Sequence, residues 1–285
     1  MQLTNNLNIL TFLRALPSDS EESLTIDFSG VSFTDPGSVV GVACLADRAR
    51  ADGRQVTFVA PRDNNVCNYL SRMHLGEALD GLGATHNLGR VRENDLRGEL
   101  LELVKFSGIN SGDDLATLVY DKLEGRTDVY PAVAESLQNS IAELSTNVRT
   151  HAQVTHGYAM AQTIPSRSLI KFAIGDAGIG LKKSLEHNRD QPVLDDENAI
   201  GLAVQANITS TGERGRGSGL AEVVSSTVGF GGKVVLASGK AAVRHERTTP
   251  EDEDDTLANV SYTYCLPNAY NGTIVQAEIC YQPGR

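Results

Sequence analysis

The alternation of apolar and polar positions predicts small α/β units at the start of the chain. Segments LTIDFSG at 24–30 and QVTFVA at 55–60 alternate as strands do, whereas residues 38–53 and 64–73 have the pattern of helices. The stretch that follows, residues 81–96, is rich in glycine and charge, which is typical of a boundary. We therefore predict a first α/β domain that ends near this stretch.

Three further segments follow before the middle of the chain. Residues 99–106 fit a strand or a short helix, and residues 113–123 have apolar positions at helical spacing. The clearest helical pattern covers residues 131–152, where Pro131 suits the first turn.

The C-terminal part combines strand patterns with glycine-rich turns. Residues 168–180 predict a buried strand that enters a glycine turn, and residues 231–239 predict another strand. The charged run at 244–259 predicts a solvated loop between strands.

Composition narrows the classes of function. With 285 residues and 40% hydrophobic side chains, the chain has enough material for two modest domains. Its formal charge of −11 argues against a sequence-independent nucleic-acid binder, because neutralising phosphates needs a basic surface. No apolar run approaches the roughly 18 residues of a membrane span, and the first residues lack a signal-peptide pattern. We expect a cytoplasmic protein without membrane contact.

The cysteines show no spacing that suits metal ligands or a redox motif. Buried, reduced thiols are therefore expected at Cys44, Cys67, Cys265 and Cys280.

The 131–152 helix has two faces. An apolar stripe runs along one, and Asn139, Glu143, Asn147 and His151 recur every four residues on another. A carboxamide oxygen of Asn147 suits Mg²⁺, and the Glu143 carboxylate suits orienting or deprotonating a nucleophile. The alternative is a helix face that is merely solvated. His151 lies near the helix end, where histidines often interact with the last carbonyls, and is not assigned to catalysis.

Asp176 follows the predicted 168–180 strand within IGDAGIG. A carboxylate there suits the exocyclic amine of adenine, and Gly178 and Gly180 allow close backbone approach to a base. The alternative is an ordinary turn in which the aspartate accepts a hydrogen bond from its own backbone.

Three alternate glycines, Gly215, Gly217 and Gly219, directly precede a predicted helix. Backbone N–H groups and the helix dipole at such a place suit a triphosphate. Their spacing fits neither the P-loop nor the dinucleotide fingerprint. Residues 181–214, between the two glycine segments, are predicted to form a lid. Its candidate phosphate-facing cations are Lys182, Lys183, Arg189 and Arg214.

Taken together, ELSTNVRTHA, IGDAGIG and GRGSGL resemble the N, G1 and G2 boxes of the GHKL superfamily, whose ATP-binding domain is that of the histidine kinases. Gly272-Thr273 resembles a fourth box. The resemblance implies a Bergerat-fold α/β sandwich over 111–285, a mixed sheet with helices on one face. It also implies Mg-ATP as ligand, with Glu143 orienting or deprotonating the nucleophile and Asn147 supplying an oxygen to Mg²⁺. The residues that the resemblance assigns to binding adenine and the phosphates are Asp176, Gly178, Gly180, Gly215, Gly217, Gly219 and Thr273.

Residues 7–80 resemble the STAS fold of anti-sigma-factor antagonists, which implies an α/β domain over 1–82 and a linker over 83–110. Where phosphorylatable members have Asp-Ser, this chain has Asp35 followed by Pro36, which has no hydroxyl. We therefore expect no phosphate at this turn, which is either a docking surface flanked by Thr34 and Ser38 or a turn in which Pro36 merely shapes the start of the helix.

The two resemblances favour a regulatory ATPase that acts through lid closure and the binding of a protein partner. An anti-sigma-type serine/threonine kinase and a nucleotide-gated binding module without hydrolysis remain alternatives. The resemblance leaves a homodimer possible. A conventional histidine kinase is disfavoured, because no His-bearing two-helix segment precedes the ATP domain.

Overall fold

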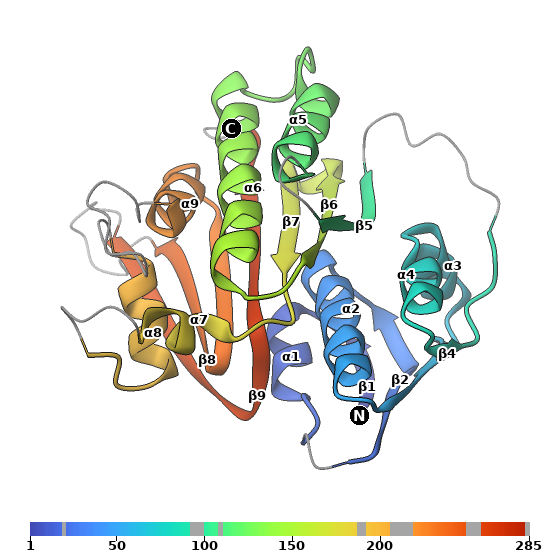
Figure 1. Cartoon of the computed structure of the whole chain (residues 1–285). Coiled ribbons are helices and arrows are strands. Elements are labelled where there is room, and N and C mark those ends of the chain that lie inside the picture. The colour runs from blue at the N-terminus through green and yellow to red at the C-terminus, as the bar shows by residue number, and fades with distance from the viewer. Residues whose placement is uncertain are drawn as a thin grey trace.

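The chain combines helices with one parallel and one antiparallel sheet (Figure 1). A computed structural model describes residues 1–18, 21–91, 100–107, 111–186, 192–205, 219–248 and 258–282. The first sheet has four strands in the order β1-β2-β3-β4, and the pairs are parallel. The second has five strands in the order β5-β6-β7-β9-β8, and the pairs are antiparallel.

Strands and helices alternate in the first part of the chain, as the sequence pattern predicts. The elements are β1 (Gln2–Asn6), α1 (Ile9–Arg14), β2 (Ser23–Phe33), α2 (Pro36–Ala51), β3 (Gln55–Val59), α3 (Asn64–Arg72), α4 (Leu75–Gly81) and β4 (Thr85–His86). The two strands and two helices predicted here are confirmed, with ends displaced by one to a few residues.

The second part builds the antiparallel sheet and its helices. Its elements are β5 (Leu100–Ser107), α5 (Ser111–Leu123), α6 (Pro131–His151), β6 (His156–Ile164), a short 3₁₀ turn (Pro165–Arg167), β7 (Leu169–Gly175), α7 (Gly180–Leu185), α8 (Asp196–Ala203), α9 (Gly219–Gly229), β8 (Lys233–Thr248) and β9 (Ala258–Cys280). The choice left open at 99–106 resolves to strand β5, because this segment pairs with β6. The stretch 83–110, expected to be a linker, thus contains β4, which belongs to the first sheet, and β5, which belongs to the second.

The loop predicted at 244–259 is wrong at both ends. Strand β8 continues to Thr248 and pairs there with Ala258 of β9. Successive side chains of a strand point to opposite faces of the sheet. At this end of the hairpin both faces are at least partly exposed, so charged side chains such as Arg244 and Glu246 are compatible with pairing. Residues 249–257 lie outside the described residues.

Helix α2 lies between the two sheets. It packs against β2 and β3 of the first sheet and against β6, β7 and β9 of the second. A helix that is apolar on all sides is stable only when it is buried on all sides, and α2 consists mainly of small and β-branched residues that are fully buried. The first part of the chain is therefore packed into the core of the second.

This packing corrects the expected mixed sheet with helices on one face. The second sheet is antiparallel, and α5, α6 and α9 cover one of its faces (Figure 1). Successive residues of β7 enter different cores: Phe172 and Ile174 pack with α6, whereas Ala173 packs with α1 and α2. Helices α1 and α2 thus cover the opposite face.

The turn at Asp35 is buried, which overturns its expected role as a docking surface. Thr34 is 5% exposed and Ser38 is fully buried. The Asp35 carboxylate caps α2 by accepting from the Ser38 backbone N–H at 3.0 Å, and Gly37 N–H donates to Gln276 Oε1 of β9 at 2.7 Å. Pro36 at the first helical position fits the simpler explanation that it shapes the start of the helix.

The four cysteines are free, but they are not all buried as expected. Cys44 is buried, Cys67 and Cys280 are partly buried, and Cys265 is exposed. Among the helices within the described ranges, none is long and apolar enough to cross a membrane.

Candidate functional site

Glu143 and Asn147 lie one turn apart on α6, and both side chains are partly buried. The Asn147 amide lies close enough to the Glu143 carboxylate to lower its pKa, against a larger effect of burial that raises it. An amide that donates through its nitrogen keeps its oxygen as an acceptor, so the Asn147 oxygen stays available to a cation.

Glu143 touches the start of α9. A Cβ atom at Gly219 would overlap the Glu143 carboxylate, so a larger residue there would displace the Glu143 side chain from this position. Burial raises the pKa of Glu143, and the negative charge of Glu222 in the first turn of α9 raises it further. A raised pKa makes this carboxylate a stronger proton acceptor at neutral pH than an exposed glutamate.

Asp176 lies at the end of β7, next to β9. Its backbone N–H donates to the Thr273 carbonyl at 2.9 Å, and its Oδ1 accepts from Gly178 N–H at 2.8 Å. The local turn that the sequence offered as an alternative is thus present. Burial raises the pKa of Asp176 to about 6, against hydrogen bonds from the Gly178 and Thr273 backbone that lower it. At neutral pH the carboxylate is mainly ionised, and its remaining lone pairs can accept from a ligand.

The turn after Asp176 packs on the C-terminal end of α6. Ile179 N–H donates to the Ala152 carbonyl at 3.0 Å. A Cβ atom at Gly178 would overlap the same carbonyl, so the close approach requires glycine. Helix α6 therefore contacts Gly219 through Glu143 and the Asp176 turn through Ala152.

Strands β8 and β9 hold the other side of this turn. Ser238 Oγ donates to the Gly272 carbonyl at 2.9 Å and accepts from Leu181 N–H at 2.9 Å. Gly272 has a φ of 115°, and a Cβ atom there would overlap the Asp176 carbonyl. Gly180 also has positive φ, 78°. Ser238 was not predictable from the sequence, because a lone serine in a strand carries no motif signal.

The structure brings the predicted residues together in two groups joined by α6. Asp176, Gly178, Gly180 and Thr273 form the first group, at the end of the helix. Glu143, Asn147 and Gly219 form the second. Gly215 and Gly217 lie outside the described residues.

The predicted lid contains more regular structure than expected. Helix α8 packs on β8, and its Ala199 and Ile200 are fully buried. Asp196 Oδ2 accepts from Lys240 N–H at 2.8 Å, which ties the helix to the strand. Among the candidate cations, Lys182 Nζ donates to the Leu194 carbonyl at 3.3 Å and Lys183 is exposed. Arg189 and Arg214 are outside the described residues.

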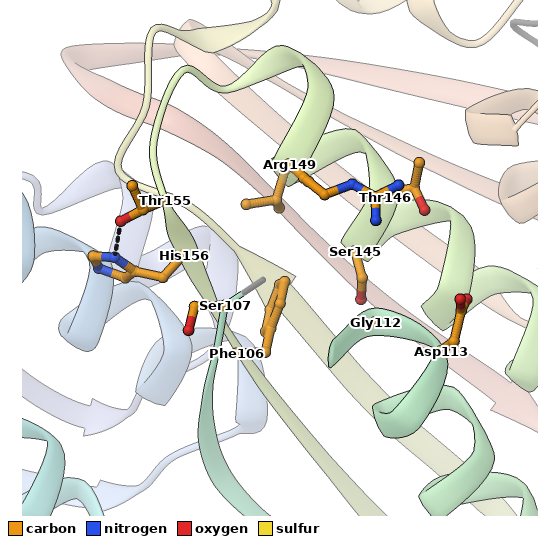
Figure 2. A pocket seen from close by; sticks show the side chains of 10 residues that line it. Phe106, Ser107, Gly112, Asp113, Ser145, Thr146, Arg149, Thr155 and His156 are labelled. Atoms are coloured by element: carbon orange, nitrogen blue, oxygen red, sulfur yellow. Dashed lines mark hydrogen bonds between the residues drawn. The ribbon is translucent and has the colours of Figure 1, made fainter. Parts of the chain in front are cut away.

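A small pocket of about 20 Å³ lies on the other side of α6 (Figure 2). Its wall combines the first turn of α5 with β5, the start of β6 and α6 residues such as Ser145 and Arg149. In Figure 2, Thr155 is hydrogen-bonded to His156, at 3.1 Å. None of the predicted site residues lines this pocket, because Ser145 and Arg149 project from α6 roughly opposite to Glu143 and Asn147.

A magnesium site here needs oxygen donors from outside the protein. Among the described residues, no group of three or more His, Cys, Asp or Glu side chains is placed to hold a metal ion. Mg²⁺ is commonly held by one or two protein ligands together with the phosphates of a nucleotide, and a single Asn147 oxygen fits that arrangement.

No family model and no curated protein matches this chain.

Proposed function

We propose that the chain binds Mg-ATP at the end of α6 and uses it as a regulatory switch. The observation that carries the proposal is that α6 makes two contacts: Glu143 lies against Gly219, and the Ala152 carbonyl at the helix end accepts from the turn after Asp176. Four segments far apart in the sequence, carrying Glu143, Asp176, Gly219 and Thr273, are connected through this helix and its neighbouring strands. A helix start beside a carboxylate and a carboxamide suits a triphosphate with its cation.

Each residue has a distinct role in this proposal. Asp176 accepts the adenine amine, Asn147 holds Mg²⁺, and the start of α9 at Gly219 faces the phosphates. Glu143 orients and deprotonates the nucleophile, and its raised pKa supports that role. The negative charge of Glu222 maintains this basicity.

Water is the proposed nucleophile, so the chain is an ATPase. A protein hydroxyl in place of water would make it a serine/threonine kinase. The hydroxyls that flank Pro36 do not suit that role, because Thr34 and Ser38 are buried. A kinase would therefore need an acceptor elsewhere.

Pure protein incubated with Mg²⁺ and γ-labelled ATP, alone and with cell extract, separates these functions. We expect the pure protein to release the label as free phosphate, and its release to add to that of extract alone. Label on this chain, or on an extract protein that extract alone leaves unlabelled, would replace the ATPase with a kinase. Bound but intact ATP would leave a binding module, and the absence of any bound nucleotide would refute the proposal.

A further inference from the structure

We propose that Tyr270 is a positioning residue for Asp176, and that α2 of the first part of the chain holds Tyr270 in place through Cys44. This inference rests on the proposed function, because it assigns a source to the adenine specificity of the same site. It makes α2 a structural part of the nucleotide site.

One face of α2 contacts the second sheet along its length. Gly37, Val40, Cys44 and Asp47 follow one another at intervals of three or four residues, which places them on one side of the helix. Gly37 is hydrogen-bonded to Gln276, and the Asp47 carboxylate lies 2.6 Å from His156 Nε2. Both ends of this face are thus fixed to the second sheet.

The middle of the same face reaches the residue before Asp176. A Cβ atom at Gly175 would lie 3.1 Å from Val40 Cγ1 and 3.2 Å from Cys44 Sγ. Helix α2 is therefore packed tightly against the backbone at the end of β7, and a side chain at Gly175 would fit only if α2 moved. A displacement of α2 toward the sheet would push directly on the backbone that carries Asp176.

Tyr270 connects α2 to Asp176 itself. Its side chain is 3% exposed, and its hydroxyl donates to the Asp176 carbonyl at 3.4 Å. The Cys44 thiol lies close enough to the same hydroxyl to shift its pKa, and both groups belong to one buried cluster. These groups are buried together, so a hydrogen bond that is lost here is not replaced by water.

A carboxylate that selects a base must be held close to one position. Binding geometries tolerate displacements of only about 0.5 Å before specific contacts weaken. The contact with the adenine amine is lost in inosine triphosphate, which carries an oxygen in place of that amine. The ratio of ATP affinity to inosine triphosphate affinity therefore reports how well Asp176 is placed.

The test compares Tyr270→Phe with Tyr158→Phe. Tyr158 is also fully buried in the second sheet, but its hydroxyl has no hydrogen-bond partner, so its loss should cost nothing. We expect Tyr270→Phe to weaken ATP binding about 3- to 10-fold and to leave inosine triphosphate binding nearly unchanged. Cys44→Ala should lower the affinity ratio in the same direction, whereas Tyr158→Phe should keep the wild-type ratio.

An unchanged ratio in Tyr270→Phe would overturn the inference, and so would an equal loss of both nucleotides, which indicates a general loss of folded protein. If the affinity ratio falls in Tyr270→Phe but stays at the wild-type value in Cys44→Ala, Tyr270 positions Asp176 without the help of α2, and that part of the inference is overturned. Wild type that binds neither nucleotide would instead refute the proposed function. Thermal unfolding of each variant checks that it is folded during the titration.

Discussion

Replacing Glu143 by Gln is expected to lower phosphoryl transfer at least about 100-fold, the usual contribution of a positioned general base. Mg-ATP affinity should stay close to that of wild type, because Asn147 still binds the ion. The amide has nearly the same shape as the carboxylate, so the close contact with Gly219 is kept. Only the negative charge and the proton acceptor are lost, and release of labelled phosphate measures the effect.

Glu135→Gln is the matched control, since Glu135 is exposed on the same helix. It removes the same charge from α6 and should leave turnover unchanged. Turnover of Glu143→Gln at the wild-type rate would eliminate Glu143 as the base. A parallel loss of ATP binding would place it among the binding residues instead.

Gly272→Ala is expected to destabilise the protein by about 3 kcal/mol or more, a size typical of backbone strain combined with overpacking. The backbone at Gly272 has positive φ, and its Cβ position is already occupied by the Asp176 carbonyl. The strand ends must separate to admit the methyl group. Nucleotide binding should weaken as well, because Asp176 moves with its carbonyl.

Gly231→Ala separates the two causes of that loss. Gly231 also has positive φ, 72°, but nothing lies within 4 Å of its Cβ position. Its replacement should therefore cost only the strain of a side chain at positive φ, about 1–2 kcal/mol. Chemical unfolding of both variants gives the comparison, and equal losses would show that Gly272 is not tightly packed against Asp176.

Local pattern was sufficient to predict most elements of this chain. The alternation in β2 and β3 and the apolar stripe of α6 each reflect one buried face, which a sequence displays directly. Residues 99–106 stayed ambiguous because a short apolar run fits either state until a partner strand is known. Pairing with β6 decides it.

The arrangement of the two parts could not be predicted in the same way. Helix α2 reads as an ordinary apolar helix, and nothing in its sequence says that a second sheet covers it. The buried turn at Asp35 follows from that packing, so its burial was missed too. Helix α8 was missed because it is only 8 residues long and lies within a stretch that is polar as a whole.

The candidate site was predictable where glycines mark close approach. Gly178 and Gly219 are explained by contacts with Ala152 and Glu143, which join segments that the sequence separates widely. Supporting residues such as Ser238 and Tyr270 were not predictable, because their roles depend on which backbone groups lie opposite them. Specific contacts of this kind arise only from the tertiary fold.

Isothermal titration of the pure chain with ATP in the presence of Mg²⁺, beside the Asp176→Asn variant, tests nucleotide binding most directly. An asparagine presents an N–H donor as readily as an acceptor toward the adenine amine. We predict that wild type binds Mg-ATP and that the variant binds about 10- to 100-fold more weakly, the cost of about 1–3 kcal/mol for one unsatisfied buried polar group. Absence of binding in wild type, or equal affinity in the two proteins, would contradict the proposed site.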